Sequence, residues 1–198
     1  MTKADRIRPR AGDALIIVDL QNDFLPGGNL AVPGGDATVP VMNVYVERFA
    51  AQRLPIVATR DWHPANHCSF KAQGGPWPPH CVAESPGAQF APGLALPADV
   101  RIVSKATRPD ADAYSGFAGT DLDEWLRNQG VRRVFVGGLA TDYCVLNTVR
   151  DACRLGYDVW VLVDAIRAVD VKAGDGDRAI TEMAALGART AQLGDLEN

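Results

Sequence analysis

The three histidines of this chain gather in one short stretch. His63, His67 and His80 fall within eighteen consecutive residues, and Asp61 stands two positions before the first of them. Imidazoles and carboxylates are ligands of protein-bound Zn, Fe and Mn, so the grouping predicts one divalent metal ion of one of these kinds. In an extended segment Asp61 and His63 face the same side, and His80 completes a three-ligand site with open positions. His67 is either a fourth ligand or a residue that orients one.

A cysteine in the setting of a nucleophile follows the fourth expected strand. Residues 137–140 lead out of that strand, and Cys144 lies in the first turn of the helix that comes next. Backbone N–H groups and the dipole at a helix N-terminus favour a thiolate, and the same amides could hold an oxyanion. The alternative interpretation is that Cys144 is a small buried apolar residue, as free cysteines often are.

The other three cysteines are expected to be structural. Four cysteines at irregular spacing do not make a disulfide scaffold. Cys153 continues an apolar helical stripe with Val145 and Val149, which places it in the core. Cys68 and Cys81 flank histidines, but the expected metal site has oxygen and nitrogen donors, and we interpret both cysteines as structural.

Charged residues end two further expected strands. Asp19 directly follows an apolar run, where partial desolvation should raise its proton affinity, so that it can act as a base near neutral pH. The competing interpretation is that Asp19 caps a turn. Lys105 ends the third strand, where it could hold a negative charge in place or could be a solvated lysine.

Short apolar runs alternate with amphipathic stretches, which predicts an α/β fold. Strands are expected over residues 14–19, 56–59, 101–104, 134–136, 159–163 and 189–193, and helices over 39–51, 121–129, 142–155 and 171–186. The strands are continuously apolar, as is typical of strands covered on both faces, so we expect a three-layer α/β/α, doubly wound and mainly parallel sheet. Ligands bind such sheets beyond the carboxyl ends of the strands. The irregular, proline-rich segment 64–97 is therefore expected to be a metal- and substrate-site loop.

The composition of the chain limits its number of domains and the kinds of partner that it can bind. The 198 residues are 47% hydrophobic and 22% charged, and no linker divides them, which predicts a single domain over 1–198 with a flexible tail over 1–12. A net charge of -4 lacks the basic footprint of nucleic-acid binders, so a small neutral substrate fits better. No apolar run reaches the roughly 18 residues of a membrane span, and the first ten residues hold no signal-peptide core. We expect a cytoplasmic protein without a membrane or nucleic-acid partner.

Several short motifs stand in order along the chain. They are Val18-Asp19-Leu20-Gln21-Asn22-Asp23-Phe24, Asp61-Trp62-His63, Trp77-Pro78-Pro79-His80-Cys81, Lys105, Tyr114-Ser115-Gly116-Phe117 and Gly138-Leu139-Ala140-Thr141-Asp142-Tyr143-Cys144-Val145. Together they resemble the nicotinamidase (pyrazinamidase) family of the isochorismatase-like cysteine hydrolases, over about residues 15–193. The resemblance implies the isochorismatase-like hydrolase fold, with six strands in the order 3-2-1-4-5-6. It also implies metal-dependent hydrolysis of nicotinamide, and of pyrazinamide, through a cysteine thioester in NAD salvage.

The resemblance also implies roles for particular residues. The family's catalytic residues match Asp19, Lys105 and Cys144, and its metal ligands match Asp61, His63 and His80, with His67 matching a further ligand of some members. A cis peptide between Leu139 and Ala140 would aim the amides of Ala140 and Cys144 at the substrate oxygen as an oxyanion hole. The implied substrate-binding residues are Phe24, Trp77, Tyr114, Leu139 and Ala140. Tyr143 departs from the pattern, because several relatives carry a histidine at this position.

Two other functions stay open at this point. A related cysteine amidohydrolase, acting on a carbamoyl group or another small amide, would share Asp19, Lys105 and Cys144 but would need the metal less. A non-enzymatic metal-binding or redox-sensing domain would use Cys144 as a switch. The sequence also leaves open whether the metal activates water or anchors the pyridine nitrogen, and whether the chain forms a homo-oligomer.

Overall fold

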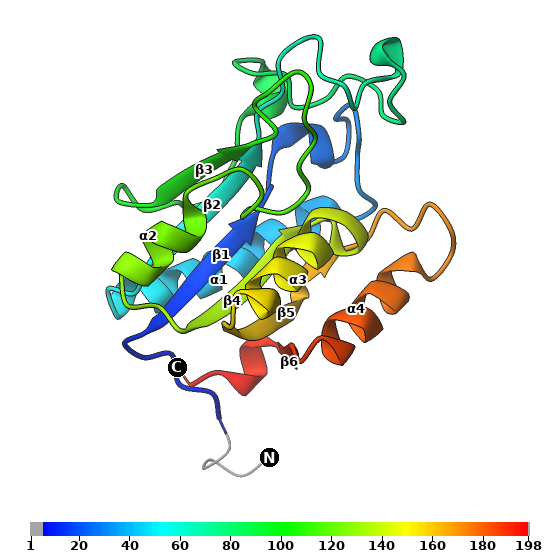
Figure 1. The fold of residues 1–198 in the computed structure, drawn as a ribbon. Helices are drawn as coiled ribbons and strands as arrows, with labels where there is room; N and C mark the ends of the chain where they lie inside the picture. The colour runs from blue at the N-terminus through cyan, green and yellow to red at the C-terminus, as the bar shows by residue number, and fades with distance from the viewer. Residues whose placement is uncertain (1–5, 198) are drawn as a thin grey trace.

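Six parallel strands form the central sheet (Figure 1). The structure is a computed structural model that describes residues 6–197. The strands are β1 (Asp13–Val18), β2 (Ile56–Asp61), β3 (Arg101–Lys105), β4 (Arg133–Leu139), β5 (Asp158–Arg167) and β6 (Arg189–Ala191). Their order is β3-β2-β1-β4-β5-β6, and every pairing between neighbours is parallel. The expected fold class and strand order are therefore confirmed.

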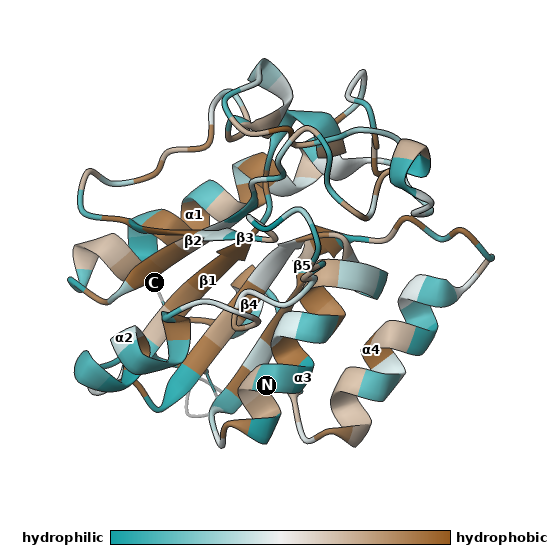
Figure 2. Cartoon of the chain, turned by 45° about the horizontal axis from the view of Figure 1, so that its top comes forward, coloured by the Kyte–Doolittle hydropathy of each residue, from teal (hydrophilic) through white to brown (hydrophobic). Residues whose placement is uncertain are grey.

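Four α-helices cover the two faces of this sheet. They are α1 (Thr38–Ala51), α2 (Leu122–Asn128), α3 (Leu146–Arg154) and α4 (Asp175–Ala185). Residues of α1 pack into one apolar cluster, whereas residues of α2, α3 and α4 pack into the other. Apolar residues line the strands while the helices show polar outer surfaces (Figure 2). The chain thus forms three layers, α/β/α.

Strand β1 shows why the expected strands are apolar throughout. Its residues Ile16 and Val18 contact the cluster beneath α2, α3 and α4, whereas Leu15 and Ile17 contact the cluster beneath α1. All four side chains are fully buried. A strand covered on both faces needs apolar residues at every position, because successive side chains point to opposite faces.

Two expected helices begin later than the sequence pattern suggests. Residues 142–155 were expected to form one helix, but Thr141–Val145 form a π-helical turn and α3 begins at Leu146. The expected helix 171–186 begins at Asp175. The Asp142 carboxylate explains part of this shift, because it accepts hydrogen bonds from the amides of Val169 and Asp170 and holds them in a loop.

The segment 64–97 crosses the carboxyl ends of the strands without a long helix or strand. It contains two short 3-10 turns, Lys71–Gln73 and Pro86–Ala88. Isolated bridges pair Val82 with His63 and Phe90 with Gln21, so the segment is tied to the residues that follow β2 and β1. Figure 1 shows these loops gathered at one end of the sheet.

Both ends of the described chain meet at the opposite end of the sheet. Ile7 pairs with Leu196, and its amide donates a hydrogen bond of 2.7 Å to the Asp195 carbonyl. Residues 1–5 of the expected flexible tail lie outside the described residues. Within residues 6–197, no helix combines the length and the apolar character that crossing a membrane requires.

Candidate active site

Three buried charged residues meet where β1, β2 and β3 end. Asp19 follows β1, Asp61 is the last residue of β2, and Lys105 is the last residue of β3. The register of the sheet pairs Asp61 with Lys105. The Lys105 ammonium contacts Asp61 Oδ1 directly and lies 2.9 Å from Asp19 Oδ2. Asp19 and Lys105 thus lie together, and Asp61, expected as a metal ligand, shares the same lysine.

Burial governs the protonation of this group. Desolvation raises the pKa of Asp19 above its usual 3.8, although the Lys105 ammonium and a hydrogen bond from Thr59 oppose the rise. Burial would also raise the pKa of Asp61, but the Lys105 ammonium opposes the rise and that pKa is lowered. Burial alone would lower the pKa of Lys105, yet Asp19 and Asp61 raise it well above its usual value. The lysine is therefore a fixed cation, and Asp19 is the carboxylate with the greater proton affinity.

The expected nucleophile lies against the same group. Cys144 Sγ is 3.5 Å from Lys105 Nζ, and the sulfur and an oxygen of Asp19 and of Asp61 lie within 4.8 Å of one another. Cys144 is 5% exposed. Burial raises the pKa of its thiol well above the usual value, and Lys105 offsets this only in part. Because burial disfavours the thiolate, a neighbouring base must take the proton.

The chain before the nucleophile has an unusual backbone. The peptide bond between Leu139 and Ala140 is cis, as the family resemblance implies. The Val145 amide donates to the Ala140 carbonyl, five residues earlier, which makes the turn around Cys144 wide. Gly138 has φ +125°, and any added Cβ would overlap the backbone of Val18, so only glycine lets β4 pass this close to β1.

Asp61, His63 and His80 form the group expected to bind metal. Each offers one potential ligand atom, these atoms lie within 4.8 Å of one another, and all three residues are buried. His63 Nε2 is 3.6 Å from Asp61 Oδ2. The prediction that Asp61 and His63, two residues apart at the end of β2, face the same side is thus confirmed, and the loop 64–97 brings His80 to them.

The ring nitrogens of this group fit a metal. His63 Nδ1 donates to the Ala106 carbonyl at 3.3 Å, and His80 Nδ1 donates to the Pro78 carbonyl at 2.8 Å. These bonds assign the tautomers and leave Nε2 of each ring with a free lone pair. His63 Nε2 is buried and makes no hydrogen bond within residues 6–197. Burial lowers the pKa of His80, which favours the neutral ring that a metal needs.

His67 lies beside the metal group but is turned to other partners. Its ring centroid is 4.2 Å from that of His63. However, its Nδ1 pairs with Ser69 Oγ at 2.7 Å and its Nε2 with the Ala111 carbonyl at 3.2 Å. With both nitrogens engaged, His67 supports the ring of His63 and is not part of the three-residue group.

A mostly apolar pocket joins the nucleophile to the metal group. It is lined by Phe24, Leu30, Val32, Asp61, Trp77, His80, Tyr114, Ala140, Tyr143, Cys144 and Val169. Trp77 Nε1 donates to the Tyr114 hydroxyl at 3.0 Å, and the Trp77 ring meets Tyr143 edge-on at 5.2 Å. One cleft therefore holds the sulfur, two of the metal-group residues and a set of aromatic rings.

The lining differs from the expected one in several residues. Leu139 was expected to bind substrate, but its side chain is fully buried in the cluster beneath α1 and does not line the pocket. Leu30, Val32 and Val169 line it without having been expected. The first two lie in a loop between β1 and α1 and the third follows β5, so neither strand nor helix periodicity marks them.

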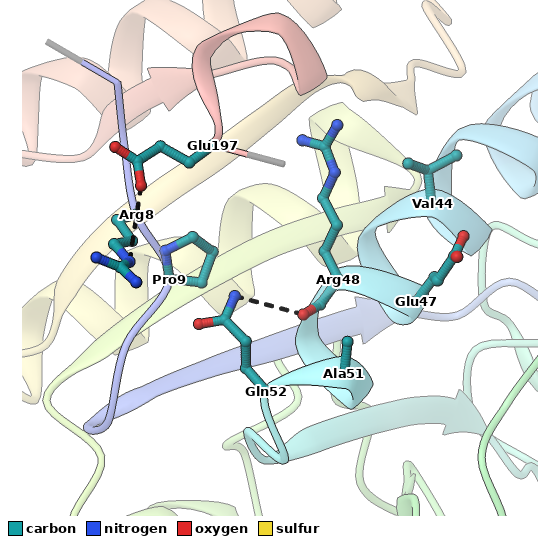
Figure 3. Close-up of a pocket in the computed structure, with 8 residues that line it drawn as sticks. All are labelled: Arg8, Pro9, Val44, Glu47, Arg48, Ala51, Gln52 and Glu197. Atoms are coloured by element: carbon teal, nitrogen blue, oxygen red, sulfur yellow. Dashed lines mark hydrogen bonds and ion pairs between the residues drawn. The ribbon is translucent and has the colours of Figure 1, made fainter. Parts of the chain in front are cut away.

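A wider surface groove lies elsewhere and shares no residue with this cleft. It is lined by Arg8, Pro9, Val44, Glu47, Arg48, Ala51, Gln52 and Glu197 (Figure 3). Arg8 and Glu197 form an ion pair of 3.6 Å across it, and Arg48 donates to the Leu193 carbonyl. The groove joins both ends of the described chain to α1, at the end of the sheet opposite the nucleophile.

Comparisons with known proteins agree with this fold and site. Residues 13–195 match the Isochorismatase domain family. The nicotinamidase of Escherichia coli (strain K12) is 43% identical over 93% of this chain and 96% of its own length. The crystal structure of pyrazinamidase of Pyrococcus horikoshii in complex with zinc superposes with a TM-score of 0.89, at 50% identity, over 92% of this chain and 99% of that one. PnC1 from L. infantum in complex with nicotinate gives a TM-score of 0.88, at 40% identity, over 94% and 96%.

This chain belongs to the Isochorismatase domain family. It is an amidohydrolase that acts on an amide C–N bond.

Proposed function

We propose that this protein is a nicotinamidase, which hydrolyses nicotinamide to nicotinate and ammonia and also accepts pyrazinamide, as a step of NAD salvage. One observation carries the proposal. Cys144, which contacts Lys105, lines the same aromatic pocket as Asp61 and His80 of the Asp61–His63–His80 group. The similarity of this chain to a nicotinamidase and a pyrazinamidase supports the same substrates.

Acylation requires transfer of the Cys144 thiol proton to Asp19. The thiol pKa is raised by burial and the carboxylate pKa is raised as well, so this transfer accompanies attack on the substrate. The sulfur adds to the carboxamide carbon, and the amides of Ala140 and Cys144 hold the oxyanion. Lys105 contacts both the Asp19 carboxylate and the sulfur and so holds them next to each other.

Collapse of the tetrahedral adduct breaks the C–N bond. Asp19 gives its proton to the leaving nitrogen, ammonia departs, and the nicotinoyl group stays on Cys144 as a thioester. A water then adds to the thioester carbon while Asp19 takes one of its protons. Breakage of the C–S bond releases nicotinic acid, which loses its proton to solvent to give nicotinate, and the proton on Asp19 returns to the sulfur.

Asp61, His63 and His80 would hold one divalent ion, which is Zn, Fe or Mn. The fit rests on the free Nε2 lone pairs of the two rings and on the carboxylate beside them. When bound, such an ion supplies a Lewis acid beside the nucleophile. The Pyrococcus horikoshii relative is described in complex with zinc.

The aromatic residues Phe24, Trp77 and Tyr114 would enclose the pyridine ring, with Ala140 beside the carboxamide. Phe24 packs on His80 with ring centroids 5.7 Å apart, so the ring site and the metal site share a wall. The expectations of a cytoplasmic location, of no nucleic-acid partner and of a possible homo-oligomer stay part of this proposal.

A direct assay tests the proposal. Purified protein loaded with zinc is incubated with nicotinamide, and ammonia and nicotinate are measured before chelation, after chelation and after zinc is restored. We expect equal amounts of both products, loss of turnover on chelation and recovery with zinc. A protein that leaves nicotinamide intact but hydrolyses a carbamoyl compound would instead be the related amidohydrolase. Absence of any amide hydrolysis would refute the enzymatic proposal.

A further inference from the structure

Two buried polar side chains next to the site take no part in the proposed reaction. Gln21 and Asp23 follow β1, are 0% and 5% exposed, and do not line the substrate pocket. Buried polar groups are costly unless they are hydrogen-bonded, so their partners indicate what they stabilise. Both turn out to bind the backbone of residues in the metal group or next to it.

Gln21 binds the backbone of Asp61 on both sides. Its Oε1 accepts from the Asp61 amide at 2.8 Å, and its Nε2 donates to the Asp61 carbonyl at 2.8 Å. The same Nε2 also donates to the Ala88 carbonyl at 2.9 Å. The side-chain amide thus binds the last residue of β2 beyond the end of β1, and it also ties the loop 64–97 to this point through Ala88.

Asp23 binds the backbone next to His80. Its Oδ2 accepts from the Cys81 amide at 2.7 Å. Cys81 has φ +44°, a conformation that non-glycine residues adopt only when contacts hold it, and its carbonyl accepts from the His63 amide at 3.0 Å. Asp23 therefore stabilises the backbone that links His80 to His63. Its Oδ1 accepts from the Asn29 amide at 3.1 Å, which holds the adjoining loop.

Gly87 packs directly against the Asp23 carboxylate. A Cβ added at Gly87 would overlap both carboxylate oxygens, and the φ of Gly87 lies outside the left-handed region. The absence of a side chain at position 87 is thus required by Asp23 and not by the local backbone conformation. The close contact gives a second way to displace the carboxylate without removing it.

We propose that Gln21 and Asp23 are positioning residues for the metal site, which hold the backbones of Asp61 and of His80–Cys81 where the three ligands converge. This inference rests on the metal site of the proposed function. Partners that orient metal ligands typically contribute 10- to 100-fold to metal affinity. Both residues act on the metal ligands, whereas Cys144 is held by its own turn after β4.

The test uses the full-length protein and zinc alone. Zinc affinity is measured by competition with a fluorescent zinc chelator for the wild-type protein, Gln21→Met and Asp23→Asn. Each substitution keeps the side-chain length. Gln21→Met loses all three hydrogen bonds of the Gln21 side chain. Asp23→Asn keeps one acceptor oxygen but turns an NH2 group toward a backbone amide, which cannot accept a hydrogen bond. We expect about 10- to 100-fold weaker zinc binding in both variants. In the metal-free Asp23→Asn protein, whose altered contact is to Cys81 and not to Asp61, iodoacetamide should alkylate Cys144 at the wild-type rate.

Matched controls separate positioning from general damage. Asp36→Asn makes the same change at an exposed carboxylate and should leave zinc affinity unchanged. Gly87→Ala should weaken zinc binding as Asp23→Asn does, whereas Gly194→Ala, where an added Cβ meets nothing within 4 Å, should not. Gly87→Ala also tests the inference if Asp23→Asn does not fold.

Three results would overturn the inference in different ways. Wild-type affinity in Gln21→Met, Asp23→Asn and Gly87→Ala would refute it and leave the proposed function intact. Equal losses of zinc affinity and of Cys144 alkylation would show a general structural role instead. A wild-type protein that does not bind zinc would refute the proposed metal site, and this inference with it.

Discussion

The two sides of the cleft are built in different ways. On the nucleophile side, Asp19 follows β1 and Lys105 ends β3, the two strands that flank β2 in the parallel sheet, and Cys144 lies in the turn after β4. On the metal side, His80 lies in an irregular loop held by side chains that bind backbone, such as that of Asp23. The sheet itself places residues at the ends of its strands, whereas a residue in a loop is held in place by hydrogen bonds to that loop. The comparison therefore predicts that the two sides can be damaged separately.

Asp61 is where the two sides meet. One carboxylate oxygen contacts the Lys105 ammonium, and the other lies 3.6 Å from His63 Nε2. The Lys105 ammonium lowers its pKa, so Asp61 stays ionised and can serve as an anionic ligand over the whole neutral range. Changes at Asp61 should therefore damage both sides, and the separate tests below avoid it.

The largest effect is expected from the nucleophile. Cys144→Ala removes the atom that forms the thioester, so nicotinamide turnover should fall by about 10⁴-fold or more. Zinc affinity should stay at the wild-type value, because the sulfur is not part of the Asp61–His63–His80 group. Product release and chelator competition measure the two quantities. Continued ammonia release from this variant would rule out the thioester route.

Loss of a metal-group residue should give the opposite pattern. His80→Ala removes a ring nitrogen of the group, so zinc affinity should fall by more than the roughly 100-fold that an orienting partner contributes. Alkylation of Cys144 in the metal-free protein should be unchanged. His67→Ala is the matched control, with a smaller loss, because both nitrogens of His67 already have partners. An equal loss in the two variants would make His67 a ligand.

The acid limb of the pH profile tests Asp19 as the base. Asp19 must be ionised to accept the thiol proton, so kcat/KM should fall as the pH drops through its pKa, which burial raises above 3.8. Thr59 Oγ1 donates to Asp19 Oδ1 at 2.6 Å and lowers this pKa. Thr59→Val should therefore move the acid limb to higher pH. Thr38→Val, which loses a buried hydrogen bond to the Gly35 carbonyl, should leave the limb in place.

The smallest effect on activity is expected from substitutions of the aromatic residues that line the pocket. Trp77→Phe removes the hydrogen bond to Tyr114, worth about 1 kcal/mol, and should raise KM for nicotinamide about fivefold with little change in kcat. Tyr114→Phe breaks the same bond. The rise in KM of the double variant should therefore be close to that of either single variant and smaller than the two rises combined. Full additivity in steady-state kinetics would show that the bond does not shape the pocket.

Much of the fold could be predicted from the sequence. Continuous apolar runs mark strands buried on both faces, and Asp19, Lys105 and Cys144 were found because each stands where a strand ends or a helix begins. Asp61 and His63 were found from their spacing of two. These features depend on neighbours in the sequence, which is why local patterns reveal them.

The rest depends on contacts between distant segments. Asp23 and Cys81 are 58 residues apart, and no local pattern marks their hydrogen bond. Leu30 and Val169 reach the pocket from loops without periodicity. The raised pKa of the Cys144 thiol follows from burial, which the position of a residue at a helix start does not reveal.

A crystal structure of the Cys144→Ala variant with zinc and nicotinamide tests the central claim most directly. The account predicts zinc bound by Asp61, His63 and His80, and the pyridine ring among Phe24, Trp77 and Tyr114 with its carboxamide carbon facing position 144. Zinc bound away from these residues, or nicotinamide bound where its carboxamide cannot reach position 144, would contradict it.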